Sequence, residues 1–209
     1  MSDTLVLAGA DLVLPDRIVA AGTLVIEDGR IIDILPRIIP TAAGVPRLDL
    51  SGHVIVPGFV DLHVHGLEGL DTLDGPHAVR ELASRMPRFG VTAFSPTTVA
   101  CSPADLRKVI AAVRACREAP QSDHARVLPA HLESNFINPS YKGAQPGHCL
   151  RTPASALVGP PPQTRPLPAG GDFTGADIMQ AIVEAGPDVG IVTIAPELDG
   201  GIDLVRHLV

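Results

Sequence analysis

The first 56 residues carry short apolar runs separated by turn residues, a pattern typical of β-strands joined by tight turns. The dipeptide Asp28-Gly29 stands between two of these runs, and Asp-Gly in that position favours a two-residue β-hairpin. Short strands at this spacing predict a small β-sandwich or open barrel, with a single sheet that covers a larger domain as the alternative. The predicted strands span residues 5–9, 11–14, 22–27, 30–35, 48–50 and 53–56.

From residue 57 onward the period changes, because apolar strands alternate with segments whose apolar residues recur every three to four positions. Ser102 and Thr174 are each followed three residues later by an aspartate, which predicts a capped helix start at both places. This order predicts an α/β fold with a parallel sheet, the first half of a (β/α)8 TIM-type barrel. The strands are expected at 60–64, 91–94, 126–133 and 190–194, and the helices at 76–89, after Ser102, after Thr174 and at 202–208.

The change of period predicts two domains. Residues 1–56 form the small β domain, and residues 57–209 form the barrel part. Residues 158–171, which include three consecutive prolines, are expected to form a long loop, either exposed or at the rim of an active site.

Composition narrows the class of protein. Hydrophobic residues make up 45% of the 209 positions, which allows a sizeable core, and a net charge of -7 without a basic stripe argues against a nucleic-acid partner. No apolar run approaches the roughly 18 residues of a membrane span, and the N-terminus lacks the basic region of a secretory signal. Three cysteines without metal-type spacing indicate reduced thiols and a cytoplasmic location.

The end of the first strand in the second region carries two histidines, His63 and His65. Side chains at i and i+2 of a strand point to the same face, so the two imidazoles lie side by side. Neutral imidazole is a good ligand for zinc, iron and related ions, and the pair therefore predicts a divalent-metal site. A half-buried strand with two polar histidines is the alternative interpretation.

A carboxylate is expected to join this pair from the third strand, which ends at Glu133. Catalytic groups of barrel enzymes come from the carboxyl ends of the strands, and alternation places Val127, Pro129, His131 and Glu133 on one face. We therefore predict that Glu133 completes a metal site with the histidine pair and that His131 contacts the substrate. Among the other histidines, His53 is expected to be structural, and His77, His124 and His207 are expected to face solvent.

Several segments of the chain resemble the amidohydrolase superfamily, and within it the N-acetylglucosamine-6-phosphate deacetylases. The segment that contains His63 and His65 resembles the superfamily's first-strand motif. Three later segments resemble the deacetylase's second, third and fourth strands with their loops. The resemblance covers nearly the whole chain. The segments are residues 57–66, 90–98, 131–133 with 136–139 and 142–146, and 192–197.

This resemblance implies a metal-dependent barrel with a composite small β domain, and a reaction that converts N-acetylglucosamine 6-phosphate to glucosamine 6-phosphate and acetate. It implies that Glu133 is the central metal ligand and that His63 and His65 match members able to hold a second ion, so one or two ions of zinc or iron are expected. Ala144 and Gln145 fall where the family contacts its phosphorylated amino-sugar substrate. We also consider a homodimer as the assembly of the protein.

Two departures from the family pattern stand out. Ser134-Asn135 follows the ligand glutamate where the family usually has Gly-Pro, and the chain stops at Val209. The family's catalytic aspartate and two further histidine ligands come later, so we expect an N-terminal portion of the enzyme, without its general acid/base and inactive alone. Another amidohydrolase of the cyclic-amide hydrolase type and a truncated, non-catalytic binding module are the alternatives.

Overall fold

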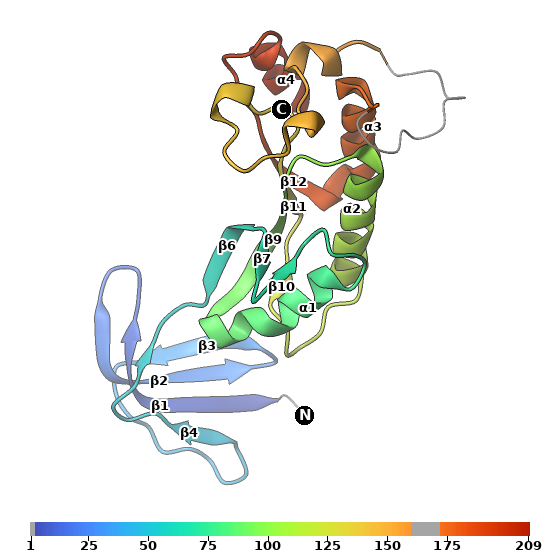
Figure 1. Ribbon diagram of the computed structural model, residues 1–209. Helices are drawn as coiled ribbons and strands as arrows, with labels where there is room; N and C mark the ends of the chain where they lie inside the picture. Colours follow the sequence, from blue (N-terminus) through green and yellow to red (C-terminus); the bar gives the residue numbers. More distant parts are fainter. Residues whose placement is uncertain (1–2, 160–171) are drawn as a thin grey trace. The chain divides into compact units, whose positions relative to one another are not determined.

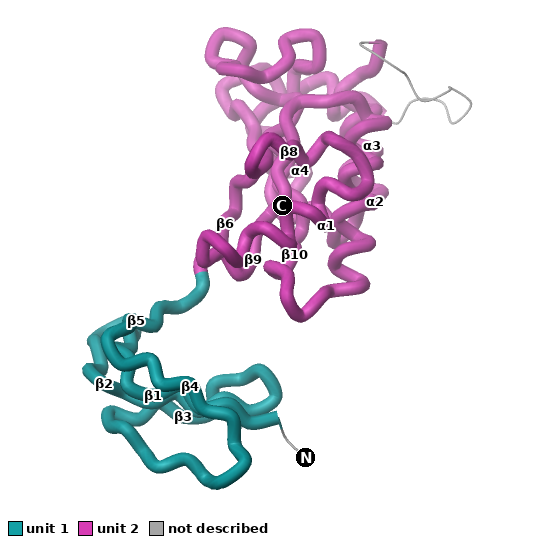
Figure 2. Tube along the Cα trace, turned by 60° about the horizontal axis from the view of Figure 1, so that its bottom comes forward, with its two compact units in different colours: residues 1–58 teal, residues 59–209 magenta. Residues whose placement is uncertain are grey.

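The computed structural model describes residues 3–159 and 172–209. It divides into two compact units, residues 1–58 and 59–209, which are coloured separately in Figure 2. The predicted loop at residues 158–171 lies outside the described residues from position 160 onward. Among residues 3–159 and 172–209, no helix combines the length and the apolar character that crossing a bilayer requires.

The first unit is one mixed sheet with a small core. Its strands have the order β3-β2-β1-β4, with β5 paired to β1, and Ala10, Leu12 and Leu24 form much of its buried cluster. The described residues of this unit form one sheet rather than the two facing sheets of a sandwich, which corrects that prediction. Exposed isoleucines on β3 show that the described residues supply no second layer there. The strands are β1 (Thr4–Val13), β2 (Ile18–Glu27), β3 (Arg30–Leu35), β4 (Arg47–Asp49) and β5 (Val54–Ile55).

The predicted hairpin at Asp28-Gly29 is confirmed, since β2 and β3 pair antiparallel on either side of it. Both turn residues have positive φ, 47° for Asp28 and 74° for Gly29, as a type I′ turn requires.

The second unit is built on a parallel sheet whose strands follow one another in chain order. β6 and β11 both pair with β9, and β12 pairs with β11. Helices α1, α2 and α3 lie on one side of this sheet in Figure 1, and their apolar residues share one core cluster with Phe94 and Leu132. Over the described residues the sheet is open. Its strands are β6 (Phe59–Val64), β9 (Val91–Thr98), β10 (Arg126–Val127), β11 (Ala130–Glu133) and β12 (Val189–Thr193).

Four helices and a small hairpin complete the second unit. The hairpin β7–β8 follows β6 directly, and a 3-10 turn at Met86–Phe89 ends the segment predicted as one helix over 76–89. Proline at position 87 lacks the amide hydrogen that a longer α-helix would use. The elements are β7 (Gly66–Leu67), β8 (Leu70–Asp71), α1 (Ala78–Arg85), α2 (Pro103–Glu118), α3 (Gly175–Ala185) and α4 (Gly201–Leu208).

The third predicted strand is interrupted at Pro129. Arg126 lies opposite Ala93, whereas His131 lies opposite Thr97. Between these two pairs the third strand therefore contains one residue more than β9. An inserted residue reverses the alternation of side chains. Val127 consequently packs in the core cluster, and the prediction that it shares a face with His131 and Glu133 is wrong.

Both predicted helix caps are present. The Ser102 hydroxyl accepts a hydrogen bond from the Asp105 amide at 3.1 Å. Thr174 and Asp177 form a complete capping box at the start of α3, in which each side chain binds the other residue's backbone amide. These caps satisfy amide groups that have no partner within the helix.

Replacing Ser102 with alanine should lower the free energy of unfolding by about 1 kcal/mol, because the Asp105 amide loses its acceptor. Ser84→Ala is the matched control, since its hydroxyl only bonds the Glu81 carbonyl within α1 and alanine favours a helix interior. Urea unfolding of both variants measures the difference. An equal loss in both would contradict the role assigned to the cap.

The three cysteines are all free and buried. Burial raises the pKa of the Cys101 thiol from 9.0 to about 12. The unfolded chain therefore loses this proton first, so the thiol's contribution to stability is present below about pH 9 and disappears as the pH rises towards 12.

We expect Cys101 in the folded protein to react slowly with iodoacetamide at pH 8, because the thiolate is the nucleophile and this thiol stays protonated. Mass spectrometry of the alkylated peptide, with and without urea, measures the protection. Equal rates in both conditions would contradict the burial of this thiol.

Candidate metal centre

Two imidazoles and one carboxylate meet at the carboxyl end of the parallel sheet. His63 is the penultimate residue of β6, His65 follows that strand, and Glu133 is the last residue of β11. The Nε2 atoms of His63 and His65 are 3.0 Å apart, and Glu133 Oε2 lies 2.9 Å from His65 Nε2 and 3.8 Å from His63 Nε2. The structure therefore brings together the three residues that the sequence singled out as metal ligands.

This arrangement has the dimensions of a metal site. Two donor atoms bound to one zinc-like cation at about 2.0–2.2 Å are roughly 2.8–3.6 Å apart. Two of the three separations fall in this range, and the third exceeds it by a few tenths of an ångström. Within the described residues these are the only three histidine, cysteine or acidic side chains grouped closely enough to hold an ion. Two nitrogens and one oxygen suit zinc or iron.

The donors are held differently by their surroundings. The side chains of His63, His65 and Glu133 are 48%, 33% and 27% exposed, so a water molecule or a substrate can reach them. The Asp61 carboxylate accepts a hydrogen bond from the His63 amide at 3.1 Å, which fixes the backbone at the strand end. Nδ1 of His65 is buried and has no hydrogen-bond partner in the described part of the chain, so Nε2 carries the ring's polar contacts.

His131 lies beside this group with both ring nitrogens occupied. Its Nδ1 is 2.8 Å from the Leu62 carbonyl oxygen and its Nε2 is 2.8 Å from the Thr193 hydroxyl, while its ring meets His63 edge-on at 4.9 Å. Burial lowers the pKa of His131, which favours the neutral ring. A neutral imidazole can donate from Nδ1 to the carbonyl and accept the Thr193 proton at Nε2. His131 thus ties β12 to β6, and its predicted substrate contact stays a prediction.

Thr193 is a residue that the sequence analysis missed. Its only sequence signal is a polar, β-branched residue at the end of a predicted strand, which is not specific. Thr193 contacts His131 because β12 pairs with β11, with Glu133 opposite Thr193 in the register.

Ala144 and Gln145, which the family resemblance places at the sugar, lie in a turn after the metal centre. Gln145 is buried, and its Oε1 accepts a hydrogen bond from the Ala100 amide at 2.7 Å, while Ala144 is exposed. The side chain of Gln145 therefore anchors this turn to the loop after β9. The substrate contact of both residues stays a prediction.

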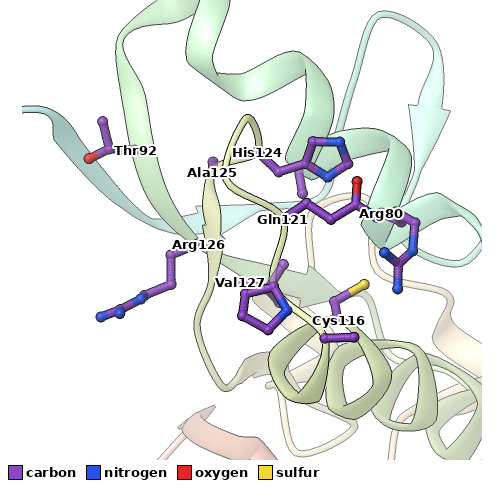
Figure 3. Close-up of a pocket in the computed structure, with 11 residues that line it drawn as sticks. Arg80, Thr92, Cys116, Gln121, His124, Ala125, Arg126 and Val127 are labelled. Carbon is purple, nitrogen blue, oxygen red and sulfur yellow. The ribbon is translucent and has the colours of Figure 1, made fainter. Parts of the chain in front are cut away.

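A separate cavity of about 250 Å³ lies near the start of β9 and β10, away from the carboxyl ends. Figure 3 shows Arg80, Cys116, Gln121 and His124 around it. The His124 side chain is only 15% exposed, so the prediction that it faces solvent is wrong. It comes from the α2–β10 connection, which folds back against α1 through the Ala125 amide.

Comparison with solved structures shows which fold the chain shares with known proteins. No family model matches the chain. The solved structure of N-acetylglucosamine-6-phosphate deacetylase from Pasteurella multocida superposes with a TM-score of 0.77 at 15% identity, and covers 97% of this chain and 48% of that one. At this level of identity the match concerns the fold alone, an α/β chain preceded by a small β unit.

Sequence comparison then gives the particular relatives. The N-acetylglucosamine-6-phosphate deacetylase of Bacillus subtilis is 28% identical over 211 residues, 100% of this chain and 48% of that protein. The same enzyme of Lysinibacillus sphaericus is 35% identical over 87% of this chain and 41% of its own length. An N-acetylgalactosamine-6-phosphate deacetylase of Escherichia coli O157:H7 is 28% identical over 92% of this chain and 47% of its length. The predicted resemblance is confirmed: the chain is similar to the N-terminal portion of these enzymes and spans about half their length.

Proposed function

We propose that the protein containing this chain is a metal-dependent amide hydrolase that removes the N-acetyl group of N-acetylglucosamine 6-phosphate. The observation that carries this proposal is the convergence of His63, His65 and Glu133 at one end of the parallel sheet. Similarity to deacetylases over the whole chain supports the choice of reaction and of substrate.

In this proposal the three side chains hold one or two divalent cations, with zinc or iron preferred by two nitrogens and one oxygen. Such a cation supplies a Lewis acid that lowers the pKa of water to near neutrality and polarises an amide carbonyl. Water adds its oxygen to the acetyl carbon, the C–N bond breaks, and a proton passes to the nitrogen, which leaves acetate and glucosamine 6-phosphate. Ala144, Gln145 and His131 are the proposed contacts of the sugar.

We also propose that the second unit is the first half of a (β/α)8 barrel and that the first unit belongs to a composite β domain. Parallel strands in chain order with helices on one side support the barrel, because each strand–helix unit of a barrel places its helix outside. A cytoplasmic location agrees with the three free cysteines of the described residues.

The alternatives predict different behaviour. A cyclic-amide hydrolase of the same superfamily would not need Glu133 at the metal, and the 2.9 Å approach of Glu133 to His65 favours the deacetylase. The epimeric sugar N-acetylgalactosamine 6-phosphate is the second candidate substrate, since one relative is named for it. A non-catalytic binding module would hold a phosphorylated sugar without releasing acetate.

The test is acetate release by the complete purified protein from both acetylated sugar phosphates, from unphosphorylated N-acetylglucosamine and from a hydantoin. We expect turnover of N-acetylglucosamine 6-phosphate, its loss after dialysis against a chelator, and its return with added zinc or iron. Elemental analysis before and after dialysis follows the metal. Full activity of protein without detectable metal, or preference for the hydantoin, would contradict the proposal.

A further inference from the structure

The dipeptide that follows Glu133 is polar and yet almost completely buried. Ser134 is 2% exposed and Asn135 is 3% exposed. Buried polar groups are costly unless they are hydrogen-bonded, so both side chains need specific partners. Their partners lie on segments that are distant in sequence and that converge around the end of β11.

Asn135 joins three segments. Its Nδ2 donates to the carbonyl oxygens of Cys101 and Cys149, both at 2.8 Å, and its own carbonyl accepts from the Arg151 amide at 2.7 Å. Cys101 belongs to the connection between β9 and α2, and Cys149 belongs to the turn after the Gln145 loop. Because both acceptors are carbonyls, only a side chain with two donor hydrogens satisfies them together.

Ser134 connects the end of β11 to β12. Its hydroxyl donates to the Thr193 carbonyl at 2.5 Å and accepts from the Phe136 amide at 3.1 Å. The Phe136 carbonyl in turn accepts from the Ala195 amide at 2.9 Å. The Thr193 hydroxyl also contacts His131. The hydrogen bond of Ser134 to Thr193 therefore connects it to a residue that lies beside His63 and His65.

We propose that Ser134 and Asn135 are positioning residues that hold the Glu133 carboxylate against His63 and His65. They fasten the two residues after Glu133 to the end of β12, to the loop that follows β9 and to the turn at Gly147–Cys149, and so restrict the backbone from which the carboxylate projects. Metal ligands require such support, because loss of an outer hydrogen-bond partner typically weakens metal affinity about 10–100-fold. This inference rests on the proposed function, since it assigns the pair to the same metal centre.

The test compares cobalt binding and amide hydrogen exchange in variants of the complete protein. Asn135→Asp keeps the shape but turns a carboxylate towards two carbonyls, Ser134→Ala removes the hydroxyl, and Ser134→Thr keeps it. Asp177→Ala is the matched control, because Asp177 is buried, caps α3 and shares no hydrogen bond with Ser134 or Asn135. Cobalt affinity is read from the visible absorption of the bound ion, and thermal unfolding verifies that each variant is folded.

We expect Asn135→Asp to weaken cobalt affinity about 10–100-fold and to speed exchange of the Arg151 amide. Ser134→Ala should weaken affinity less, Ser134→Thr should restore it, and Asp177→Ala should leave it unchanged. Native cobalt affinity in folded Asn135→Asp, or an equal loss in the Asp177 control, would overturn the inference. If Asn135→Asp does not fold, unchanged affinity in Ser134→Ala overturns it instead.

A failure of the proposed function has a different signature. In that case the unaltered protein binds no cobalt, while hydrogen exchange still tests the pair. Unchanged exchange at Arg151 in Asn135→Asp and at Phe136 in Ser134→Ala would then overturn the positioning role by itself.

Discussion

Glu133→Gln should weaken zinc affinity on the order of 10²-fold or more and abolish acetate release in parallel. The variant keeps the volume of the side chain but removes the only carboxylate in the three-residue group. A carboxylate contributes negative charge as well as a donor atom, and glutamine retains only a weak neutral oxygen donor. His63 and His65 alone offer two neutral nitrogens to a doubly charged ion.

The measurement is zinc content by elemental analysis, combined with a competition titration against a chelating dye. Glu197→Gln is the control, because Glu197 is an exposed carboxylate whose hydrogen-bond partner is Asn138. Its zinc affinity should match that of the unaltered protein. Full zinc occupancy in Glu133→Gln would remove Glu133 from the proposed metal centre.

Local signals in the sequence predicted those parts of the fold that depend on neighbouring residues. The caps at Ser102 and Thr174 and the turn at Asp28-Gly29 each involve residues within three positions of one another, and all are confirmed. Strand β9 extends to Thr98, four residues beyond its predicted end, because burial between two neighbouring strands lets polar threonines continue the ladder.

Features that depend on distant partners were not predictable. The residue inserted between Val127 and His131 alters which face Val127 occupies, and this becomes evident only when the strand is aligned with β9. Likewise, nothing in the sequence says whether the strands of residues 1–58 form one sheet or two, since both arrangements use the same alternation.

In the candidate site, too, local patterns predicted some residues, whereas contacts between distant segments were not predictable. His63 and His65 were predicted from the two-residue period of one strand, and Glu133 from the rule that parallel strands end at the same edge of a sheet. The buried partners of Asn135 could not be predicted, because the carbonyls of Cys101 and Cys149 meet there only in the folded chain. In the sequence Asn135 was visible only as a departure from a family pattern.

Phe136→Ala should lower the free energy of unfolding by about 3–5 kcal/mol. The Phe136 side chain is completely buried in the core cluster of the second unit, so its removal loses apolar burial and leaves a cavity. The backbone of Phe136 also bonds the Ser134 hydroxyl and the Ala195 amide, so relaxation into the cavity would move the loop after Glu133. We therefore expect zinc affinity to fall together with stability.

Phe89→Ala is the matched control, because the Phe89 side chain is 52% exposed and ends the 3-10 turn after α1. Its loss should cost less than about 1 kcal/mol, since much of that ring is already in water. Urea unfolding of both variants, with zinc removed, separates packing from metal binding. A loss below about 1 kcal/mol for Phe136→Ala would show that the loop after Glu133 is not anchored in the core. The support that the metal centre requires would then come from the hydrogen bonds of Ser134 and Asn135 alone.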